Sequence, residues 1–398
     1  MECTGKPVRI LGVVAEYDPF HRGHEKHLRL AKEAVQPDFT YIVLSGCFRQ
    51  RGDPAMLSPY CRARCALVSG ADAVFALPAL WTVRGAEHYA LGAVSMLRDL
   101  GTTHLAFGAE TTEPELLRRA AGLLEYPAAD FRERLRAALD AGEGYPRALS
   151  LAAASKEPEL ARTMNRPNNI LAVCYLRALM RLEAPVTPVP VLREGGYHAE
   201  EIDPENPSAS AVQDALRRGD YARALAAVPE ESRRMIRKAF LTGGIPDPRV
   251  YDALLIRRLR TMTREEIRNL PDVSEGLEDR LREAAKRANT RRELLDLVSG
   301  KRYPRARISR ICAWAMLNGR RDDPDRENLP RKAVLLGLRR NPEMTALWRE
   351  KGNLITEAWE DRADLLAWQV RAQCTGKPDT LPWTEKVAVF PRKDSDSF

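Results

Sequence analysis

The chain has 398 residues, of which 44% are hydrophobic and 30% charged, and its formal net charge at pH 7 is +8. This length exceeds what one ordinary core accommodates and favours two to three domains. The composition excludes a disordered chain, and because no apolar run approaches about 20 residues we expect no transmembrane helix and no membrane partner.

The N-terminal sequence and the cysteines indicate the compartment. Residues 1–10 contain no apolar stretch of the kind that a secretory signal peptide needs. Seven cysteines are present, and only Cys61 and Cys65 stand close together, four residues apart on an expected helix. We therefore expect reduced thiols in the cytoplasm. This pair is expected to pack in the core, because no further soft metal ligands stand near it.

Strand-like and helical patterns alternate over the first 110 residues. Short apolar runs predict buried strands at 10–15, 41–44, 73–77 and 104–107. Helical spacing predicts helices at 24–34, 59–69 and 86–100. This alternation predicts an α/β fold with a parallel sheet, in which ligands bind beyond the carboxyl ends of the strands. Three of these ends carry 17–19 (YDP), 45–46 (SG) and 108–110 (GAE), which we expect to converge on one crevice.

The pattern His21-Arg22-Gly23-His24 stands where the first strand gives way to a helix. With His27, three of the six histidines of the chain fall within seven residues. Unpaired N–H groups and the helix dipole at such a helix start favour a phosphate. The histidines can hydrogen-bond phosphoryl oxygens, and Gly23 removes a side chain where the backbone approaches the ligand. The alternative is two surface histidines at a helix start.

Three further segments carry residues suited to anions. Arg49 and Arg51 share a loop at 47–54 and could hold a triphosphate or a nucleic-acid backbone, or simply be solvated. Asn168 opens a helix that runs to residue 182, a role that asparagine commonly plays. Arg193 follows a proline-punctuated edge strand at 186–192 and precedes a glycine pair, where it could reach an anion.

Beyond residue 200 the periodicity is helical almost throughout, and a domain boundary is expected near 199–207. Residues 301–340 hold twelve Lys or Arg and four Asp or Glu, which leaves 51 of each sign elsewhere. This local surplus favours a polyanionic partner, although charged runs are often only solvated faces. The basic residues expected to contact RNA or DNA phosphates are Lys301, Arg302, Arg305, Arg307 and Arg310. Tyr303 is expected to offer a surface for base stacking.

Together these segments carry a family resemblance. Residues 12–24 (GVVAEYDPFHRGH) resemble the opening of the bacterial tRNA(Met) cytidine acetate ligase family, in the HIGH nucleotidyltransferase superfamily. The likeness continues in chain order through 45–52 (SGCFRQRG), 107–110 (FGAE), 167–171 (PNNIL), 193–198 (REGGYH) and 301–303 (KRY). Asp18 and Cys47 depart from it, because asparagines are expected at both positions. The region after about 330 shows no firm match.

The resemblance implies a Rossmann-like HIGH nucleotidyltransferase domain at 1–200 and a mostly α-helical tRNA-binding domain at 201–398. The implied enzyme is a ligase that uses ATP, with Mg²⁺, to convert acetate to acetyl-adenylate. It then acetylates N4 of the wobble cytidine of elongator tRNA(Met), releasing AMP and pyrophosphate overall. His21 and His24 are the implied catalytic residues. The implied ATP contacts are Val14, Ala15, Glu16, Tyr17, Asp18, Pro19, Phe20, His21, Gly23, His24, His27, Gly108, Asn168 and Arg193.

Two other functions are compatible with parts of this pattern. An adenylyltransferase acting on a small phosphorylated metabolite would use the same nucleotide motifs, but it leaves the basic block at 301–340 unexplained. An RNA-binding protein with a vestigial nucleotide fold would explain the basic block, but the intact His21, Gly23 and His24 argue against it. No dedicated carboxylate site for a metal and no protein partner are expected.

Overall fold

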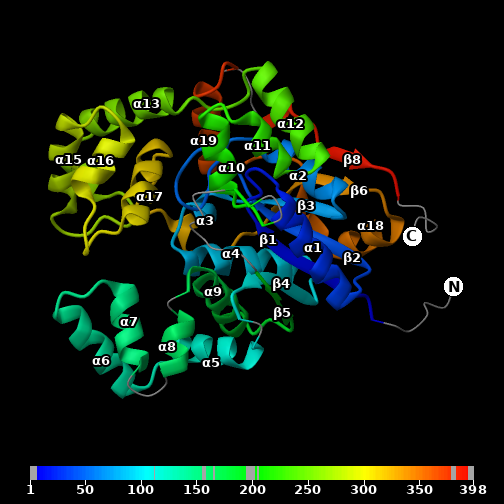
Figure 1. Ribbon diagram of the computed structural model, residues 1–398, viewed down its shortest axis with the longest axis horizontal. Coiled ribbons are helices and arrows are strands. Elements are labelled where there is room, and N and C mark those ends of the chain that lie inside the picture. Colours follow the sequence, from blue (N-terminus) through cyan, green and yellow to red (C-terminus); the bar gives the residue numbers. More distant parts are fainter. Residues whose placement is uncertain are drawn as a thin grey trace.

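The computed structural model describes residues 7–111, 113–154, 158–164, 166–193, 202–203, 206–377 and 382–392. A single mixed sheet runs through the molecule and helices cover it (Figure 1). Its strands are β1 (Ile10–Ala15), β2 (Phe39–Ser45), β3 (Ala73–Leu77), β4 (His104–Ala109), β5 (Thr187–Leu192), β6 (Ala333–Arg339), β7 (Ile355–Thr356) and β8 (Ala388–Phe390). The sheet order is β5-β4-β1-β2-β3-β6-β7, and β8 also pairs with β6.

The first five strands are parallel, as the sequence predicts, and they form the Rossmann-like part of the fold. The four strands predicted as buried are present. The proline-punctuated segment forms β5, which lies at the sheet edge, where a missing N–H is tolerated. The helices that connect or cover these strands are α1 (Arg22–Val35), α2 (Pro59–Val68), α3 (Ala79–Thr82), α4 (Ala86–Asp99) and α9 (Pro167–Arg181).

The C-terminal part of the chain completes the sheet, which the helical periodicity beyond residue 200 did not predict. Strand β6 pairs antiparallel with β3, and β7 and β8 extend it. Gly337 permits this packing, because a Cβ there would lie 2.6 Å from a methyl carbon of Leu67 and 3.1 Å from the carbonyl oxygen of Ala388. Helices α18 (Pro342–Arg349) and α19 (Arg362–Gln373) accompany these strands. Strands β6 to β8 belong to the same sheet as β1 to β5, so the sheet itself does not end at residue 200. The assignment of nucleotide binding to residues 1–200 and tRNA binding to residues 201–398 stays a prediction.

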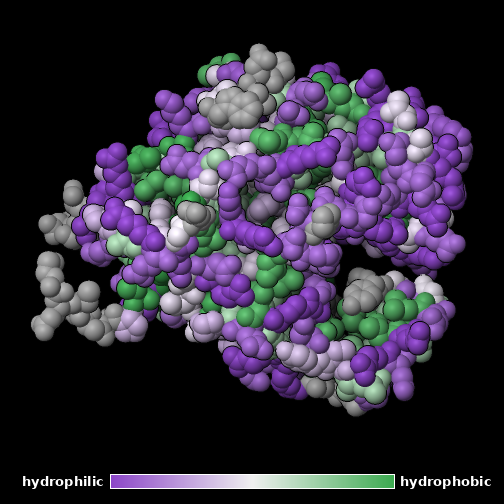
Figure 2. Space-filling view, turned by 180° about the vertical axis from the view of Figure 1, so that it is seen from behind, coloured by the Kyte–Doolittle hydropathy of each residue, from purple (hydrophilic) through white to green (hydrophobic). Residues whose placement is uncertain are grey.

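Two helical groups extend from this body. Helices α5 (Pro114–Glu125), α6 (Ala129–Asp140), α7 (Tyr145–Ala154) and α8 (Pro158–Met164) form one lobe. The second group contains α13 (Pro248–Thr261), α14 (Arg264–Arg268), α15 (Leu277–Arg287), α16 (Arg291–Val298) and α17 (Arg305–Met316). Figure 2 shows a hollow between them. The two groups approach each other at Gly144, where an added Cβ would lie 3.5 Å from the carbonyl oxygen of Lys301.

Three more helices precede the second group in the chain: α10 (Ala209–Arg217), α11 (Tyr221–Ala226) and α12 (Glu230–Leu241), of which α12 packs against α2. Short 3₁₀ turns occupy Pro324–Arg326, Gly352–Leu354 and Pro382–Thr384. Within the described ranges, no helix combines the length and the apolar character that crossing a membrane requires.

Candidate nucleotide site

The paired histidines cap the first helix of the sheet domain. His21 is the N-cap of α1, and its Nδ1 accepts the backbone N–H of His24 at 3.3 Å. In return, Nδ1 of His24 accepts the backbone N–H of His21 at 3.3 Å, so the two residues form a reciprocal capping box. Their imidazole rings stack with centroids 3.5 Å apart. The sequence pattern thus builds a helix start from two imidazoles instead of the usual hydroxyl and carboxylate.

This capping arrangement determines where the histidine protons lie. Because both Nδ1 atoms accept hydrogen bonds, the neutral rings carry their hydrogen on Nε2, which is then a donor. The Nε2 atom of His21 is buried and has no hydrogen-bond partner among the residues that the structure describes. Buried donors in native proteins are nearly always paired, so this N–H is positioned for a ligand that accepts hydrogen bonds.

Burial keeps these imidazoles neutral. Together with a smaller contribution from the Arg193 guanidinium, it lowers the pKa of His21 to about 3 and that of His27 to about 4. Burial also holds the pKa of His24 well below its ordinary value, with smaller contributions from His21, Arg193 and His27. At neutral pH the group therefore presents hydrogen-bond donors rather than imidazolium ions.

Two aromatic rings hold His24 in place. The ring of Tyr17 lies 4.8 Å from that of His24 and 4.7 Å from that of Phe20, centroid to centroid, and both aromatic residues are buried. Tyr17 has a left-handed backbone with φ +49°, which turns the chain at the end of β1. The other predicted contacts of this segment, Val14 and Ala15, are partly buried, and Pro19 is buried.

The structure shows a packing role for Gly23. A Cβ at this position would lie 3.1 Å from the His21 imidazole and 3.4 Å from the carbonyl oxygen of Pro207. The space is therefore filled by protein, and the glycine lets α1 close against His21 and the segment before α10. The expectation that the backbone at Gly23 approaches a ligand stays a prediction.

The second half of the site assembles three predicted residues from distant segments. Oε1 of Glu110 accepts the backbone N–H and the Nδ2 of Asn168 at 3.2 and 2.8 Å, and Nη1 of Arg193 donates to Oδ1 of Asn168 at 3.1 Å. The Cβ position of Gly108 lies 3.9 Å from the Arg193 side chain. Oδ1 of Asn169 accepts the N–H of Glu110 at 2.8 Å, which ties the start of α9 to the end of β4.

This cluster lies near the histidines, because α1 packs against β4 and β5, and the Arg193 guanidinium helps to lower the pKa of all three imidazoles. Parallel pairing of β4 and β5 places Ala109 opposite Leu192, one residue before Arg193. Of the three strand ends predicted to converge, those of β1 and β2 are joined by Arg62, which binds Glu16, Ser45 and Gly46, and the end of β4 lies beside Arg193 at the end of β5. The remainder of the 193–198 motif, from residue 194, lies outside the described residues.

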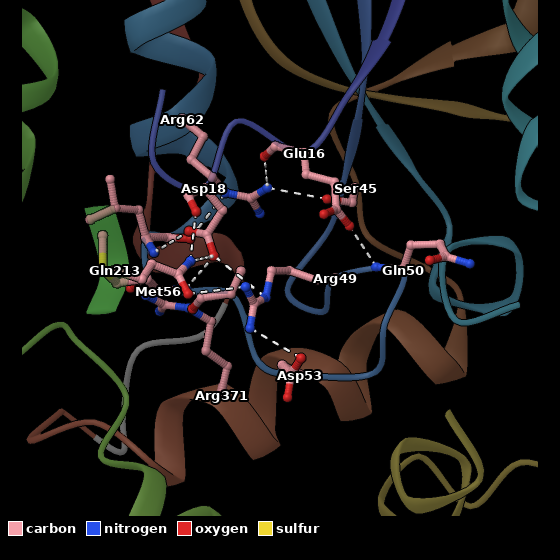
Figure 3. A network of polar contacts seen from close by, with 12 residues as sticks. Glu16, Asp18, Ser45, Arg49, Gln50, Asp53, Met56, Arg62, Gln213 and Arg371 are labelled. Carbon is pink, nitrogen blue, oxygen red and sulfur yellow. Dashed lines mark hydrogen bonds and ion pairs between the residues drawn. The ribbon is translucent and has the colours of Figure 1, made fainter. Parts of the chain in front are cut away.

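Asp18 supports the loop at 47–57 (Figure 3). Its carboxylate is 1% exposed and accepts the backbone N–H groups of Met56 and Leu57 at 2.9 and 3.0 Å. Nε2 of Gln213 also donates to it at 3.0 Å, and Arg49 lies 3.9 Å away. Both carboxylate oxygens of Asp18 therefore accept hydrogen bonds from the protein. If residue 18 contacts ATP as predicted, we expect its backbone atoms to make the contact.

The same network corrects the interpretation of Arg49. Its side chain is 18% exposed and forms an ion pair with Asp53 at 3.1 Å and a hydrogen bond to Oε1 of Gln213 at 3.0 Å. Arg49 therefore stabilises the loop, and its guanidinium is bound by protein side chains rather than left available for a phosphate. Cys47, the other departure from the family pattern, is buried, and burial raises the pKa of its thiol, which favours a packing role.

Two arginines that the sequence analysis did not select hold this loop in place. Arg62 is fully buried and donates to the backbone carbonyl oxygens of Glu16 at 2.6 Å, Leu57 at 3.1 Å and Gly46. Arg371, from α19, donates to the carbonyl oxygens of Ala55 and Met56 at 3.0 and 2.9 Å. The available signal for Arg62 was a charged residue inside the otherwise apolar α2, PYCRARCALV.

The loop also contacts the second helical group. Arg291, at the start of α16, forms an ion pair with Asp53 at 2.5 Å. The hydroxyl of Ser309 in α17 donates to the carbonyl oxygen of Arg51. Gly52 has φ +84°, and a Cβ there would lie 2.6 Å from the carbonyl oxygen of Ser309. The loop therefore lies directly between the nucleotide site and the basic helix α17.

The basic ridge, defined as Lys301, Arg302, Arg305, Arg307 and Arg310, is only partly solvent-exposed. Arg310 has a side chain that is 14% exposed and lies 3.9 Å from the Asp272 carboxylate, and Arg307 donates to the carbonyl oxygen of Asp272. Arg305 is half-exposed and pairs with Asp296. Lys301, Arg302 and Arg305 are therefore the members most available to a partner.

The expectation of a base-stacking surface at Tyr303 is wrong. Its ring is 8% exposed because the guanidinium groups of Arg280, Arg302 and Arg307 surround it at 5.7 to 5.8 Å from the centroid. Such cation–π contacts place three positive charges around one ring. Tyr303 thus arranges the arginines instead of offering its own face to a base.

A parallel sheet with paired histidines capping its first helix defines the class of HIGH nucleotidyl transferases. The family model described as HIGH Nucleotidyl Transferase matches residues 8–374. The tRNA(Met) cytidine acetate ligase of Acetivibrio thermocellus is 32% identical over 343 residues, covering 83% of each chain. That of Fervidobacterium nodosum is 32% identical over 305 residues, covering 76% of this chain and 72% of the relative.

A solved structure agrees with these matches. The crystal structure of Thermotoga maritima TmcAL bound with alpha-thio ATP has a TM-score of 0.88 and 26% identity to this chain, covering 97% of this chain and 100% of the other. The chain therefore belongs to the tRNA(Met) cytidine acetate ligase family of the HIGH nucleotidyl transferases.

Proposed function

We propose that this protein is a cytoplasmic ligase that activates acetate with ATP and acetylates N4 of the wobble cytidine of elongator tRNA(Met). The observation that carries the proposal is the reciprocal cap of His21 and His24, which leaves their Nε2–H groups as donors at the end of β1. The names of the curated relatives and the ATP analogue bound in the Thermotoga maritima structure support the same activity.

In the first step, a carboxylate oxygen of acetate attacks the α-phosphorus of ATP. The bond between this phosphorus and the oxygen bridging to the β-phosphate breaks, and pyrophosphate leaves with the electron pair. His21 and His24 donate hydrogen bonds to the phosphoryl oxygens, where negative charge builds up. The start of α1 and the Arg193 cation add favourable electrostatics. Acetyl-adenylate is the product.

In the second step, the N4 amine of cytidine attacks the acetyl carbonyl carbon. The bond from that carbon to the AMP oxygen breaks, AMP leaves, and N4 loses a proton. Activation is required because a free carboxylate offers the amine no adequate leaving group at neutral pH. The protein then needs only to hold the amine within attack distance of the bound anhydride.

Mg²⁺ is expected to accompany ATP. Within the described part of the chain no three His, Cys, Asp or Glu side chains gather as a metal site requires. Magnesium commonly binds through substrate phosphates with few protein ligands, and there it neutralises phosphate charge. The protein's own contribution to this charge is made by Arg193 and the histidine N–H groups.

We assign tRNA binding to residues 201–398 and ATP binding to residues 1–200. The ridge residues Lys301, Arg302 and Arg305 are exposed, and the guanidinium groups around Tyr303 concentrate positive charge beside them. Arg307 and Arg310 support the ridge from beneath through Asp272. Phosphate contacts of this kind fix the orientation of a nucleic acid without reading its sequence.

Labelled acetate provides the decisive test. With ATP and elongator tRNA(Met), the label should appear on one cytidine, with one AMP and one pyrophosphate formed per acetyl group. Acetyl-CoA should not replace acetate and ATP. Labelling from acetyl-CoA alone, or release of ADP and phosphate, would contradict the adenylate mechanism. Omitting tRNA should leave ATP–pyrophosphate exchange that depends on acetate.

A further inference from the structure

A second basic surface lies between α2, α12, the end of α19 and the segment 384–389. It is a cavity of about 880 Å³, adjoined along α12 by a smaller hollow of about 320 Å³. Among the described residues that line the larger cavity, Glu385 is the one carboxylate. The cations lining it are Arg64, Arg234, Lys238, Arg371, Lys377 and Lys386.

Several of these cations are not neutralised by the protein. Arg64 and Arg234 share the Glu231 carboxylate at 2.5 and 2.7 Å. Lys238, Lys377 and Lys386 are exposed, and none of them forms an ion pair with the residues that the structure describes. A cavity with such a surplus of positive charge attracts anions, because the ion pairs within the protein neutralise only some of its cations.

The outer face of α12 extends this surface. Arg234, Arg237, Lys238 and Leu241 stand at helical spacing on one side of the helix and line the smaller hollow, and Glu230 is the one carboxylate that also lines it. Arg237 is exposed, and it also forms no ion pair within the described ranges. We define the basic groove as Arg237, Lys238, Lys377 and Lys386 together with the two cavities they border.

Exposed apolar side chains stand beside these cations. Phe240 and Tyr221 are 41% and 49% exposed, and their rings meet edge to face at 5.5 Å. Leu241 is 88% exposed. Cations next to exposed ring faces are typical of surfaces that bind single-stranded RNA, where phosphates contact the cations and bases stack on the rings.

The segment before α12 also contacts the nucleotide site. The carbonyl oxygens of Ala227 and Ala226, just before α12, accept the backbone N–H and the Nε–H of Arg22 at 3.1 Å each. Arg22 is the residue between the His21 cap and Gly23. The segment that leads into α12 therefore contacts the start of α1.

We propose that the basic groove binds the phosphate backbone of the tRNA substrate, in addition to the ridge on α17. This proposal rests on the proposed function for its partner. The charge surplus, the exposed aromatic edge and the contact of the segment before α12 with α1 support RNA. A free mononucleotide would need neither the aromatic edge nor the length of α12.

The test compares two triple variants with the same change of charge. The groove variant carries Arg237→Gln, Lys238→Gln and Lys386→Gln. The control variant carries Arg340→Gln, Arg349→Gln and Lys351→Gln, three exposed cations around α18. Affinity for an elongator tRNA(Met) transcript is measured from about 50 to 200 mM salt. Thermal unfolding is recorded for both proteins to compare their folds.

The groove variant should bind tRNA at least about tenfold more weakly at the lower salt. Its slope of log affinity against log salt should fall by about 0.7 to 0.9 for each phosphate that the protein no longer neutralises, whereas the control should match the unmodified protein. Equal affinity and slope for the two variants would overturn the proposal. Loss of binding to phosphatidylserine vesicles with unchanged tRNA binding would identify a membrane surface and would also overturn it.

Acetate-dependent ATP–pyrophosphate exchange of the unmodified protein separates this proposal from the proposed function. An unmodified protein without exchange would refute acetate activation, and the comparison of tRNA binding would still decide whether the groove binds RNA. A protein with normal exchange and a groove variant indistinguishable from the control would refute the groove alone.

Discussion

Asp53 and Arg291 form an ion pair of 2.5 Å that joins the loop beside the nucleotide site to the first turn of α16. Both side chains are about four-fifths buried, with exposed fractions of 22% and 18%. On its other side the loop donates the N–H of Gln50 to Oε1 of Glu16 at 2.6 Å. The pair therefore sets the position of the helices that carry the basic ridge relative to the end of β1.

Asp53→Asn should reduce the free energy of unfolding by about 1–3 kcal/mol, because it leaves the partly buried Arg291 with a weakened partner. Acetyl transfer to tRNA should fall more than acetate-dependent pyrophosphate exchange. Urea unfolding and the two rate assays measure these effects. Asp296→Asn is the matched control, since its pair with Arg305 is half-exposed and should contribute below about 1 kcal/mol. Equal effects of the two substitutions would contradict the role of the loop.

His24→Ala should lower acetate-dependent pyrophosphate exchange by about 10²–10³-fold, as the loss of one transition-state donor does. It should also cost about 1 kcal/mol of stability, because the N–H of His21 loses its cap acceptor. His24→Asn separates the two effects. Its amide oxygen can replace Nδ1 as the acceptor, so stability should recover while exchange stays low. Recovery of exchange in the asparagine variant would show that capping alone is required.

Stability should decrease as the pH falls from about 6.5 toward 4. Burial lowers the pKa of His27 from 6.5 to about 4, so in this range the unfolded chain binds a proton that the folded protein does not. Its contribution is complete above about pH 6.5 and is lost as the pH approaches the folded value. His27→Gln should therefore narrow the difference between urea midpoints at about pH 7 and pH 5. An unchanged difference would show that His27 has the same pKa in the folded and unfolded states.

Within the basic ridge, exposure should decide the effect of each substitution. Replacing Lys301, Arg302 and Arg305 together by glutamine should weaken tRNA binding and reduce its salt dependence. Arg310→Gln should mainly lower the thermal midpoint, because its side chain is 14% exposed and lies beside Asp272. Binding titrations and thermal unfolding of the same proteins distinguish these outcomes. A strong, salt-dependent loss of affinity in the Arg310 variant alone would reverse the assignment.

Local patterns in the sequence were sufficient for the parallel half of the sheet and for the place of the histidines. Apolar runs of four to seven residues that are buried on both faces have few other structures available, and β1 to β4 follow them. The local positions of Gly108, Asn168 and Arg193 at strand ends and a helix start did not identify a nucleotide site, and only the family resemblance grouped them in one prediction. The structure brings these three together.

Tertiary structure alone decided which polar groups serve the fold and which remain available. Asp18 binds Gln213, 195 residues away, and Arg371 holds the carbonyl oxygens of residues more than 300 positions earlier. No local periodicity encodes such partners, since the burial of a side chain depends on every element that packs around it. The same reason explains the antiparallel strand β6 and the enclosure of Tyr303 by arginines from separate helices. The sequence by itself determined the parallel strands and the histidine-capped helix start, and only the packing determined which side chains of the predicted site are already paired within the protein.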